Sequence, residues 1–219
     1  MTIPAPSIDL LWQPGVPEPY FTAARIALER ATMSLGIADR LPVTTIGVYA
    51  EIGNVLNVAR GLATCIGKPG QAHVDVVTLW LAVHRWRPKE WNGFSMLIVN
   101  DDYAVPDDDF VFGSASAGIG GSVSISRFIN DVRVCDRLGL FEMMVMHEIG
   151  HALSAADPDR GSAIQLWLGS HCTNMCVMQQ RDDLPEFETD VLVAMNAGQP
   201  FCPECTRDVR RFLGGHLAT

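Results

Sequence analysis

The segment from Met143 to Leu153 constrains this chain more than any other, because it is mostly apolar and carries two histidines one helical turn apart. His147 and His151 are separated by four positions, so a helix would place both on one face. Neutral imidazoles in that arrangement can supply two of the three protein ligands of a catalytic Zn²⁺ site. Glu148 follows the first histidine directly, and its carboxylate can reach the open fourth position as a general base. The segment therefore predicts a buried helix with a metal site on one face.

The composition is that of a globular protein, and its charge disfavours nucleic acid as the main partner. The chain has 219 residues, 48% hydrophobic and 19% charged, which is enough for one domain with a sizeable core. A formal charge of −9 disfavours both nucleic acid and an anionic membrane surface. No apolar run reaches the roughly 20 residues that cross a bilayer, and the first residues do not have the pattern of a signal peptide. We therefore expect a cytoplasmic protein that does not bind a membrane.

The order of apolar segments predicts a single α+β domain over residues 1–219. Residues 1–19 are rich in proline and predict an irregular lead-in. The elements expected in the N-terminal part, residues 20–153, are a helix over 20–35, a short helix over 54–63, strands over 43–49, 94–100, 110–113 and 122–128, a Gly/Ser-rich link over 114–121, and the active-site helix over about 137–153. The C-terminal part, residues 154–219, is expected to contain helices over 186–197 and 206–213.

Four of the six cysteines lie in two close pairs in the last quarter of the chain, namely Cys172 with Cys176 and Cys202 with Cys205. In a reducing compartment, such pairs are more typical of a structural Zn²⁺ site than of disulfides. The alternative is a pair of buried thiols together with an oxidised pair. A closed Cys₄ site contributes directly to folding, so it would hold the C-terminal segment beneath the metal helix.

The helix motif and the cysteines together resemble the archaemetzincins. The residues that carry the resemblance are His147-Glu148-Ile149-Gly150-His151, then His171-Cys172, Cys176 and Met178, and finally Cys202 and Cys205. The segment from Phe110 to Ser116 is also similar, so the resemblance covers roughly residues 94–213. It implies a twisted mixed β-sheet of metzincin type packed on the zinc-binding helix. It also implies one catalytic and one structural Zn²⁺ per chain, with Met178 as the methionine of the Met-turn.

The chain departs from the metzincin spacing at the third ligand of the catalytic zinc. That spacing places a glycine and then the third ligand at positions that hold Ser154 and Asp157 here. The snapalysin-like metzincins also use Asp as this ligand. In a continuing helix, Asp157 would lie about 9 Å along the axis from His151. It can bind only if the chain turns back after Leu153, with Ser154 at positive φ at a cost of roughly 1 kcal/mol.

His171 is the competing third ligand. It precedes Cys172, as the third histidine of the archaemetzincins precedes a cysteine, but it lies much farther from the helix than in that family. The interval between Cys172 and Cys176 is also one residue shorter than in the family. His171 needs no turn at Ser154, but a long excursion must return it to the metal. Both residues remain candidates, and the spacing gives Asp157 a slight preference.

The resemblance implies a zinc metallopeptidase that hydrolyses peptide bonds with metal-activated water and Glu148 as general base. Its partner would be a peptide or protein substrate, which the strand over 122–128 could bind by backbone pairing. The alternative is a catalytically idle, zinc-stabilised protein that binds peptides or a partner. Such a protein would not need the carboxylate of Glu148.

Overall fold

The computed structural model describes residues 5–48, 73–75, 93–105, 108–130, 136–166, 169–180 and 198–216, and the helices expected over 54–63 and 186–197 lie outside these ranges. The described helices and strands are β1 (Ile8–Trp12), α1 (Glu18–Leu35), β2 (Val43–Val48), β3 (His73–Asp75), β4 (Phe94–Val99), β5 (Asp102–Val105), β6 (Asp108–Val111), β7 (Gly113–Ser116), β8 (Gly120–Ser124), α4 (Ser126–Asn130), α5 (Arg137–Ala152), β9 (Ala163–Leu166), β10 (Gly169–Cys172) and α7 (Pro203–His216).

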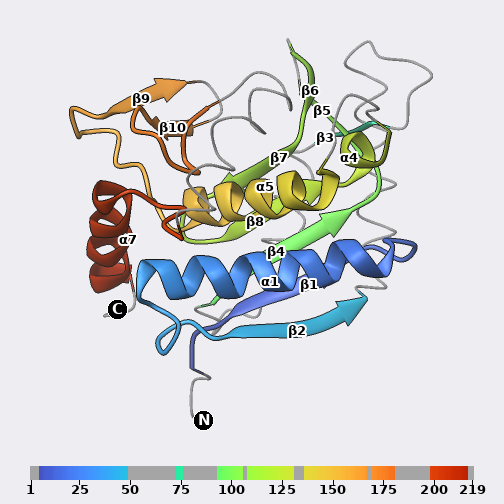
Figure 1. The fold of residues 1–219 in the computed structure, drawn as a ribbon, viewed down its shortest axis with the longest axis horizontal. Helices are drawn as coiled ribbons and strands as arrows, with labels where there is room; N and C mark the ends of the chain where they lie inside the picture. Colours follow the sequence, from blue (N-terminus) through green and yellow to red (C-terminus); the bar gives the residue numbers. More distant parts are fainter. Residues whose placement is uncertain are drawn as a thin grey trace.

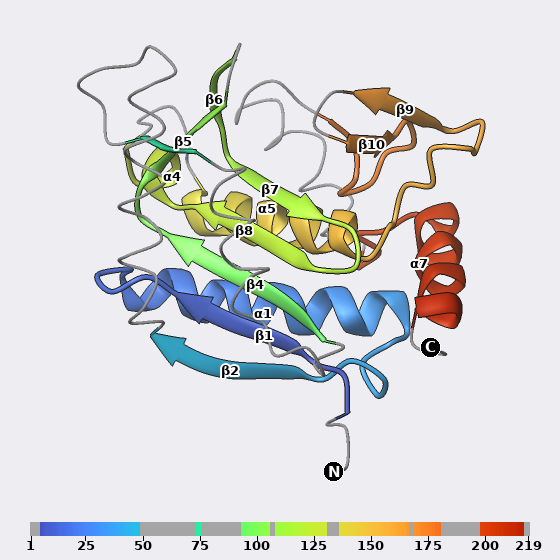
Figure 2. The ribbon, with the colours of Figure 1, turned by 180° about the vertical axis from the view of Figure 1, so that it is seen from behind.

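A mixed five-stranded sheet with the order β2-β1-β4-β8-β7 carries the rest of the fold. Its first four strands are parallel, and β7 is antiparallel to β8. Helices α1 and α5 pack side by side across one face of this sheet (Figures 1 and 2). Two smaller sheets, β3-β5-β6 and β10-β9, complete the described strands. The predicted α+β class, with a mixed sheet packed on the metal helix, is confirmed.

Strand β1 lies inside the large sheet, between β2 and β4, so the irregular lead-in predicted for residues 1–19 is wrong. Ile8 and Leu10 are fully buried and alternate with partly exposed neighbours, which is the period of a strand with one face in the core. The prolines of this segment lie before and after β1 and leave its backbone donors free to pair. Here the alternation of five residues decides the structure, and the proline-rich flanks do not.

Helices α1 and α5 agree with the sequence expectations to within a few residues. Between them and α4, the ring of Phe141 packs edge-on against both Tyr20 and Phe128, with centroid distances of 5.2 and 5.6 Å. Most of α5 is buried, including its polar residues His147 and Glu148. The metal-site segment is therefore a core helix, as its apolar composition predicts.

The region around β7 and β8 differs from the sequence prediction in two ways. The Gly/Ser-rich link expected over 114–121 instead contains most of β7 and the start of β8. The strand expected over 122–128 ends at Ser124, and residues from Ser126 form the short helix α4. Small residues suit this part of the sheet because α5 packs closely against both strands. Strand β8 has neighbours on both sides, so it cannot pair with a peptide, and the terminal strands of the described sheet are β2 and β7.

The end of α5 has the hydrogen bonds of a Schellman motif with serine in the position usually held by glycine. The Ser154 N–H donates to the carbonyl of His151 (3.0 Å), and the Ala155 N–H donates to that of Gly150 (2.9 Å). Ser154 has φ of 54°, and it is the one non-glycine residue with positive φ in the described part of the chain. The turn after Leu153 that the sequence analysis required is therefore present, with Ser154 in the left-handed region.

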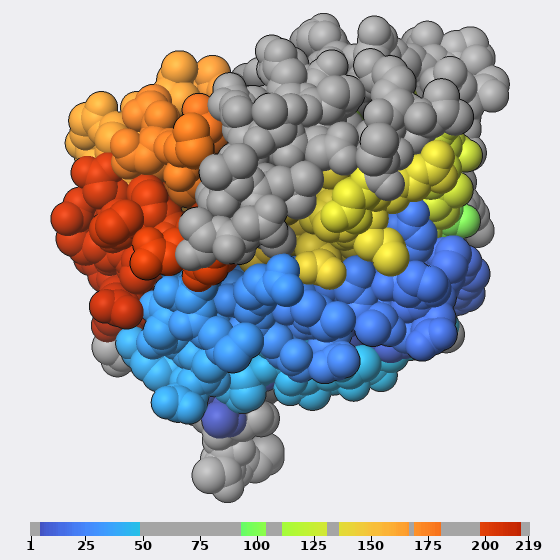
Figure 3. All heavy atoms as spheres, in the orientation of Figure 1, coloured from blue at the N-terminus to red at the C-terminus, as the bar shows by residue number. Residues whose placement is uncertain are grey.

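Beyond this turn, the chain forms the antiparallel hairpin β9–β10, and α7 follows later in the sequence. The hairpin and α7 lie together at the C-terminal end of α5, and their atoms form one continuous surface there (Figures 1 and 3). The terminal helix expected over 206–213 is confirmed and extends by several residues at each end. None of the described helices is long and apolar enough to span a bilayer.

Replacement of Ser154 by glycine tests the strain in this turn. We expect Ser154→Gly to raise the free energy of unfolding by about 1 kcal/mol, because glycine adopts positive φ without a Cβ clash. Urea denaturation monitored by circular dichroism measures the change. Ser154→Ala is the matched control, because it removes the hydroxyl but keeps the Cβ, and it should give no such gain. A glycine variant no more stable than the wild type would contradict this account.

Candidate metal centre

Three histidines from two elements converge at the C-terminal end of α5. His147 and His151 project from successive turns of the helix, and His171 enters from strand β10. The Nε2 atom of His151 lies 3.0 Å from that of His147 and 3.2 Å from that of His171. One nitrogen from each of the three rings lies within 4.8 Å of the others. The sequence prediction that the two helix histidines share a face agrees with this geometry.

Backbone carbonyls fix the orientation of two of these rings. The Nδ1 atom of His147 lies 2.7 Å from the carbonyl of Val177, and that of His171 lies 3.2 Å from the carbonyl of Gly169. A carbonyl can only accept, so Nδ1 carries the proton in both rings. The lone pair of each Nε2 then points toward the common centre. Metal-binding histidines in proteins are commonly held by this kind of outer hydrogen bond.

The surroundings keep all three imidazoles neutral. Burial lowers the pKa of His147 to about 3, with His171 adding to the effect and the hydrogen bond to Val177 opposing it. Burial also lowers the pKa of His151, well below its ordinary value, and that of His171. Loss of hydration disfavours a charged ring, so the nitrogens are unprotonated and available to a metal ion.

The spacing of the nitrogens fits a tetrahedral zinc ion. Zn–N bonds of 2.0–2.1 Å at tetrahedral angles place two ligand nitrogens about 3.3 to 3.4 Å apart. The observed separations of 3.0 and 3.2 Å are close to this value. Three neutral nitrogen donors leave one tetrahedral position open, as in catalytic zinc sites.

Glu148 directly follows His147 on α5, and its side chain packs against glycines of the sheet. A Cβ atom on Gly113 would lie 2.6 Å from both Cγ and Oε1 of Glu148, and one on Gly121 would lie 3.0 Å from its Cβ. A side chain at Gly113 would therefore displace this carboxylate. Glu148 is only 5% exposed, and burial raises its pKa to about 8. A nearby metal cation would act in the opposite direction and favour the ionised form.

Asp157, which the metzincin spacing favoured slightly, is not part of the histidine cluster. Its carboxylate pairs with Arg211 of α7, and its N–H donates to Asp208 at 3.2 Å. The turn at Ser154 therefore directs the chain toward α7 instead of back to the imidazoles. The structure brings His171, and not Asp157, to the two helix histidines. The segment between His151 and His171 consists of the loop after α5 and strand β9, and the pairing of β9 with β10 returns His171 to the end of α5.

The four cysteines form a second cluster. Cys172, Cys176, Cys202 and Cys205 have all their sulfur atoms within 4.8 Å of one another, and none forms a disulfide. The Cys172–Cys202 and Cys176–Cys205 sulfur pairs lie 3.7 and 3.8 Å apart. Zn–S bonds of 2.3 Å at tetrahedral angles require about 3.8 Å. The donor set and its spacing fit a closed Zn²⁺ site and not a covalent S–S bond, which is about 2.05 Å long.

Met178 packs against Gly150, which lies between the two helix histidines in the sequence of α5. It is fully buried, and its sulfur occupies the space that a side chain at Gly150 would need. Its carbonyl accepts from the N–H of Cys172 at 2.9 Å, and the preceding residue, Val177, orients His147. The segment that contains Met178 therefore contacts the histidine cluster and the cysteine cluster together.

Two residues that the sequence analysis missed donate hydrogen bonds to the cysteine sulfurs. Arg160 Nη2 lies 3.2 Å from Cys205 Sγ, and the N–H of Asn174 lies 3.4 Å from Cys172 Sγ. The Asn174 contact could have been anticipated, because the short loop between two metal-binding cysteines presents backbone N–H groups to sulfur. The sequence carries no comparable signal for Arg160, which is twelve positions before Cys172.

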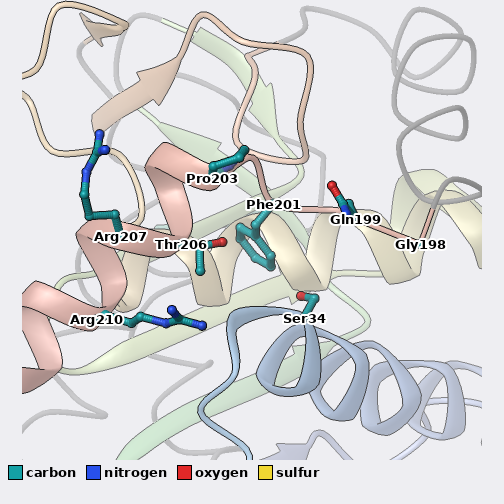
Figure 4. Close-up of a pocket in the computed structure, with 8 residues that line it drawn as sticks. All are labelled: Ser34, Gly198, Gln199, Phe201, Pro203, Thr206, Arg207 and Arg210. Atoms are coloured by element: carbon teal, nitrogen blue, oxygen red, sulfur yellow. The ribbon is translucent and has the colours of Figure 1, made fainter.

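A separate cavity of about 400 Å³ lies between α1 and α7. Figure 4 shows its lining residues: the side chain of Arg210 extends from α7 toward Ser34 on α1, and the ring of Phe201 lies beside Thr206. None of the histidines or cysteines described above lines it. The lining of this cavity contains no pair of nucleophile and base, so the histidine and cysteine clusters remain the candidate metal sites.

Comparison with known proteins gives matches by fold alone. No protein-family model and no curated protein sequence matches this chain. Archaemetzincin from Methanopyrus kandleri matches with a TM-score of 0.60 and 18% identity over 96% of this chain and 97% of its own. A zinc-dependent peptidase from Methanocorpusculum labreanum matches with a TM-score of 0.62 and 22% identity. The alignment covers 93% of this chain and 100% of that protein.

A third solved structure, archaemetzincin from Archaeoglobus fulgidus in complex with malonate, has a TM-score of 0.52 and 18% identity. It covers 92% of this chain and 99% of its own. All three alignments span almost the whole of both chains, so the likeness extends to the N-terminal region that the sequence motifs leave unassigned. The chain therefore has the archaemetzincin fold.

Proposed function

We propose that this protein is a zinc-dependent peptidase. The observation that carries the proposal is the convergence of three neutral imidazoles at the end of α5, where the buried residue Glu148 directly follows His147 on the same helix. A structural metal site does not need such a carboxylate, whereas hydrolysis needs a base next to an open metal position. The archaemetzincin fold supports the same reaction class, because solved structures with this fold include a zinc-dependent peptidase.

We assign the catalytic ion to His147, His151 and His171. The three Nε2 atoms face a common centre, and two of the rings are held by carbonyls that leave these atoms free to bind. The ion pair between Asp157 and Arg211 supports the same choice, because it engages the carboxylate of the competing ligand. Asp157 then stabilises the loop after α5 without binding the metal.

Zn²⁺ at the three histidines would supply a Lewis acid that polarises the scissile carbonyl and lowers the pKa of an attacking water toward about 7. The chain's own residues would control the proton. Glu148 would accept it from the attacking water and deliver it to the leaving amine. The absence of side chains at Gly113 and Gly121 leaves room for Glu148 against the sheet, and burial limits the access of solvent to its carboxylate.

A second Zn²⁺ is proposed at the four cysteines, with a structural role. Four thiolates fill its coordination sphere and leave no position for a substrate. Binding there would connect the loop over 172–176 to the start of α7, two segments that are distant in sequence. Metal binding of this kind contributes directly to folding, so removal of the ion should destabilise this end of the molecule.

Zinc content in two variants tests the choice of third ligand. We expect two zinc ions per wild-type chain, two in Asp157→Ala and one in His171→Ala, by elemental analysis after dialysis against metal-free buffer. Asp159→Ala is the matched control in the same loop and should retain both. Loss of one zinc from the Asp157 variant alone would identify Asp157 as the ligand, and retention of both in each variant would contradict the three-histidine site.

Replacement of Glu148 by glutamine separates an active peptidase from an idle zinc protein. We expect Glu148→Gln to keep the wild-type zinc content and to lose at least about a hundredfold in hydrolysis, because the amide cannot accept the proton. Cleavage of a mixture of quenched fluorescent peptides, with free and blocked N-termini, measures the rate. Glu142→Gln, on an outer face of the same helix, should leave the rate unchanged. Equal hydrolysis by the Glu148 variant and the wild type would rule out its role as base.

A further inference from the structure

The position of His171 depends on how the base of the β9–β10 hairpin is held. The hairpin joins four residue pairs between Ala163–Leu166 and Gly169–Cys172. Its base is closed by two bonds from Thr173, whose N–H and hydroxyl both donate to the carbonyl of Ser162, at 3.0 and 3.1 Å. These contacts fix the hairpin internally. They do not fix it relative to α5, where the other two histidines lie.

The outgoing end of the hairpin is tied to the cysteine cluster. Cys172 follows His171 directly and faces the sulfur of Cys202 at 3.7 Å. A metal ion held by the four sulfurs would therefore fix the residue next to the third histidine. The hydrogen bond from the N–H of Cys172 to the carbonyl of Met178 also holds this end of the hairpin in place.

The incoming end is tied to the same cluster by Arg160. Its side chain is only 10% exposed and crosses from the loop before β9 to helix α7. Nη1 lies 2.6 Å from Asp208 Oδ2, and Nη2 lies 3.2 Å from Cys205 Sγ. The carbonyl of Arg160 also accepts from the N–H of Ala163, the first residue of β9, at 3.2 Å.

The carboxylate of Asp208 joins this contact to the turn after α5. It is 3% exposed and accepts from Arg160, from the N–H of Asp157 and from Arg211. A buried guanidinium is tolerated only when its charge is paired, and here its partners are a carboxylate and a cysteine sulfur. When the cysteines bind a metal they are thiolates, so the donor from Arg160 then becomes a charge-assisted hydrogen bond.

We propose that Arg160 is a positioning residue that couples the two metal sites: it ties the hairpin base to Cys205 and α7, so that metal at the cysteines fixes His171 against His147 and His151. This inference rests on the proposed two-metal function. Coupling of this kind is reciprocal, so occupation of each site should strengthen binding at the other.

Cobalt substitution distinguishes the two sites in one sample. Thiolate-to-Co²⁺ charge transfer reports the cysteine site, and d–d absorption that increases without a parallel increase in charge transfer reports the histidine site. Titration of the metal-free full-length protein with Co²⁺ gives an affinity for each. Arg160→Met keeps the length of the side chain and removes both donors. Arg160→Lys keeps the charge but cannot bind Asp208 and Cys205 together.

We expect Arg160→Met to weaken Co²⁺ binding at the cysteines by about ten- to a hundredfold, the usual effect of removing a hydrogen bond to a ligand. The charge-transfer band should shift, and affinity at the histidines should fall at least about threefold in parallel. Arg160→Lys should show the same shift of the charge-transfer band, and its affinity for Co²⁺ should also fall at both sites. Arg207→Met on α7, an exposed residue with only a distant ion pair to Glu204, should match the wild type.

Wild-type affinities and band positions in a folded Arg160→Met protein would overturn this inference while leaving the two-metal function intact. If Arg160→Met does not fold, wild-type affinities and band positions in Arg160→Lys would overturn the inference instead. Weaker Co²⁺ binding at the cysteines with unchanged Co²⁺ affinity at the histidines would overturn the proposed coupling between the two sites. A wild-type protein without the thiolate charge-transfer band would instead refute the proposed cysteine metal and, with it, the inference.

Discussion

The burial of α5 against both α1 and the large sheet is the constraint on which the rest of the structure depends. A helix held on nearly all sides fixes the rotation that places His147 and His151 on one face. The same burial removes hydration from these rings, so they remain neutral and can donate nitrogen lone pairs. The close approach of the sheet at Gly113 and Gly121 confines the side chain of Glu148, which follows His147 on the helix. The packing of α5 thus sets both the placement of the two histidines and the protonation state of their rings.

In the proposed metal site, the third ligand is supplied by different means. In a metzincin with the usual spacing, a tight turn brings the third ligand back within a few residues of the helix. Here the same type of turn is present at Ser154, but the residue at the usual position pairs with Arg211. A hairpin then carries His171 to the site, and the cysteine cluster next to it holds its end. This arrangement makes the region around α7 part of the support of the histidine site.

Local patterns in the sequence predicted the helix of the metal site, the strand β4 and the close cysteine pairs, because each depends on neighbouring residues alone. Strand β1 was missed because the flanking prolines outweighed a short alternating pattern. The positions of Asp157 and His171 could not be derived from spacing. The position of Asp157 depends on an ion pair with Arg211 of α7, some fifty residues later in the chain, and that of His171 depends on the pairing of β9 with β10. Arg160 was missed for the same reason, since its partners Cys205 and Asp208 also lie on α7.

Crystals of the wild-type protein, measured at the zinc absorption edge, would test the central claim most directly. The account predicts two anomalous peaks per chain. One should lie about 2.0–2.1 Å from the Nε2 atoms of His147, His151 and His171, and the other about 2.3 Å from the four cysteine sulfurs. A first peak bound by the carboxylate of Asp157, or no peak among the three imidazoles, would contradict the account.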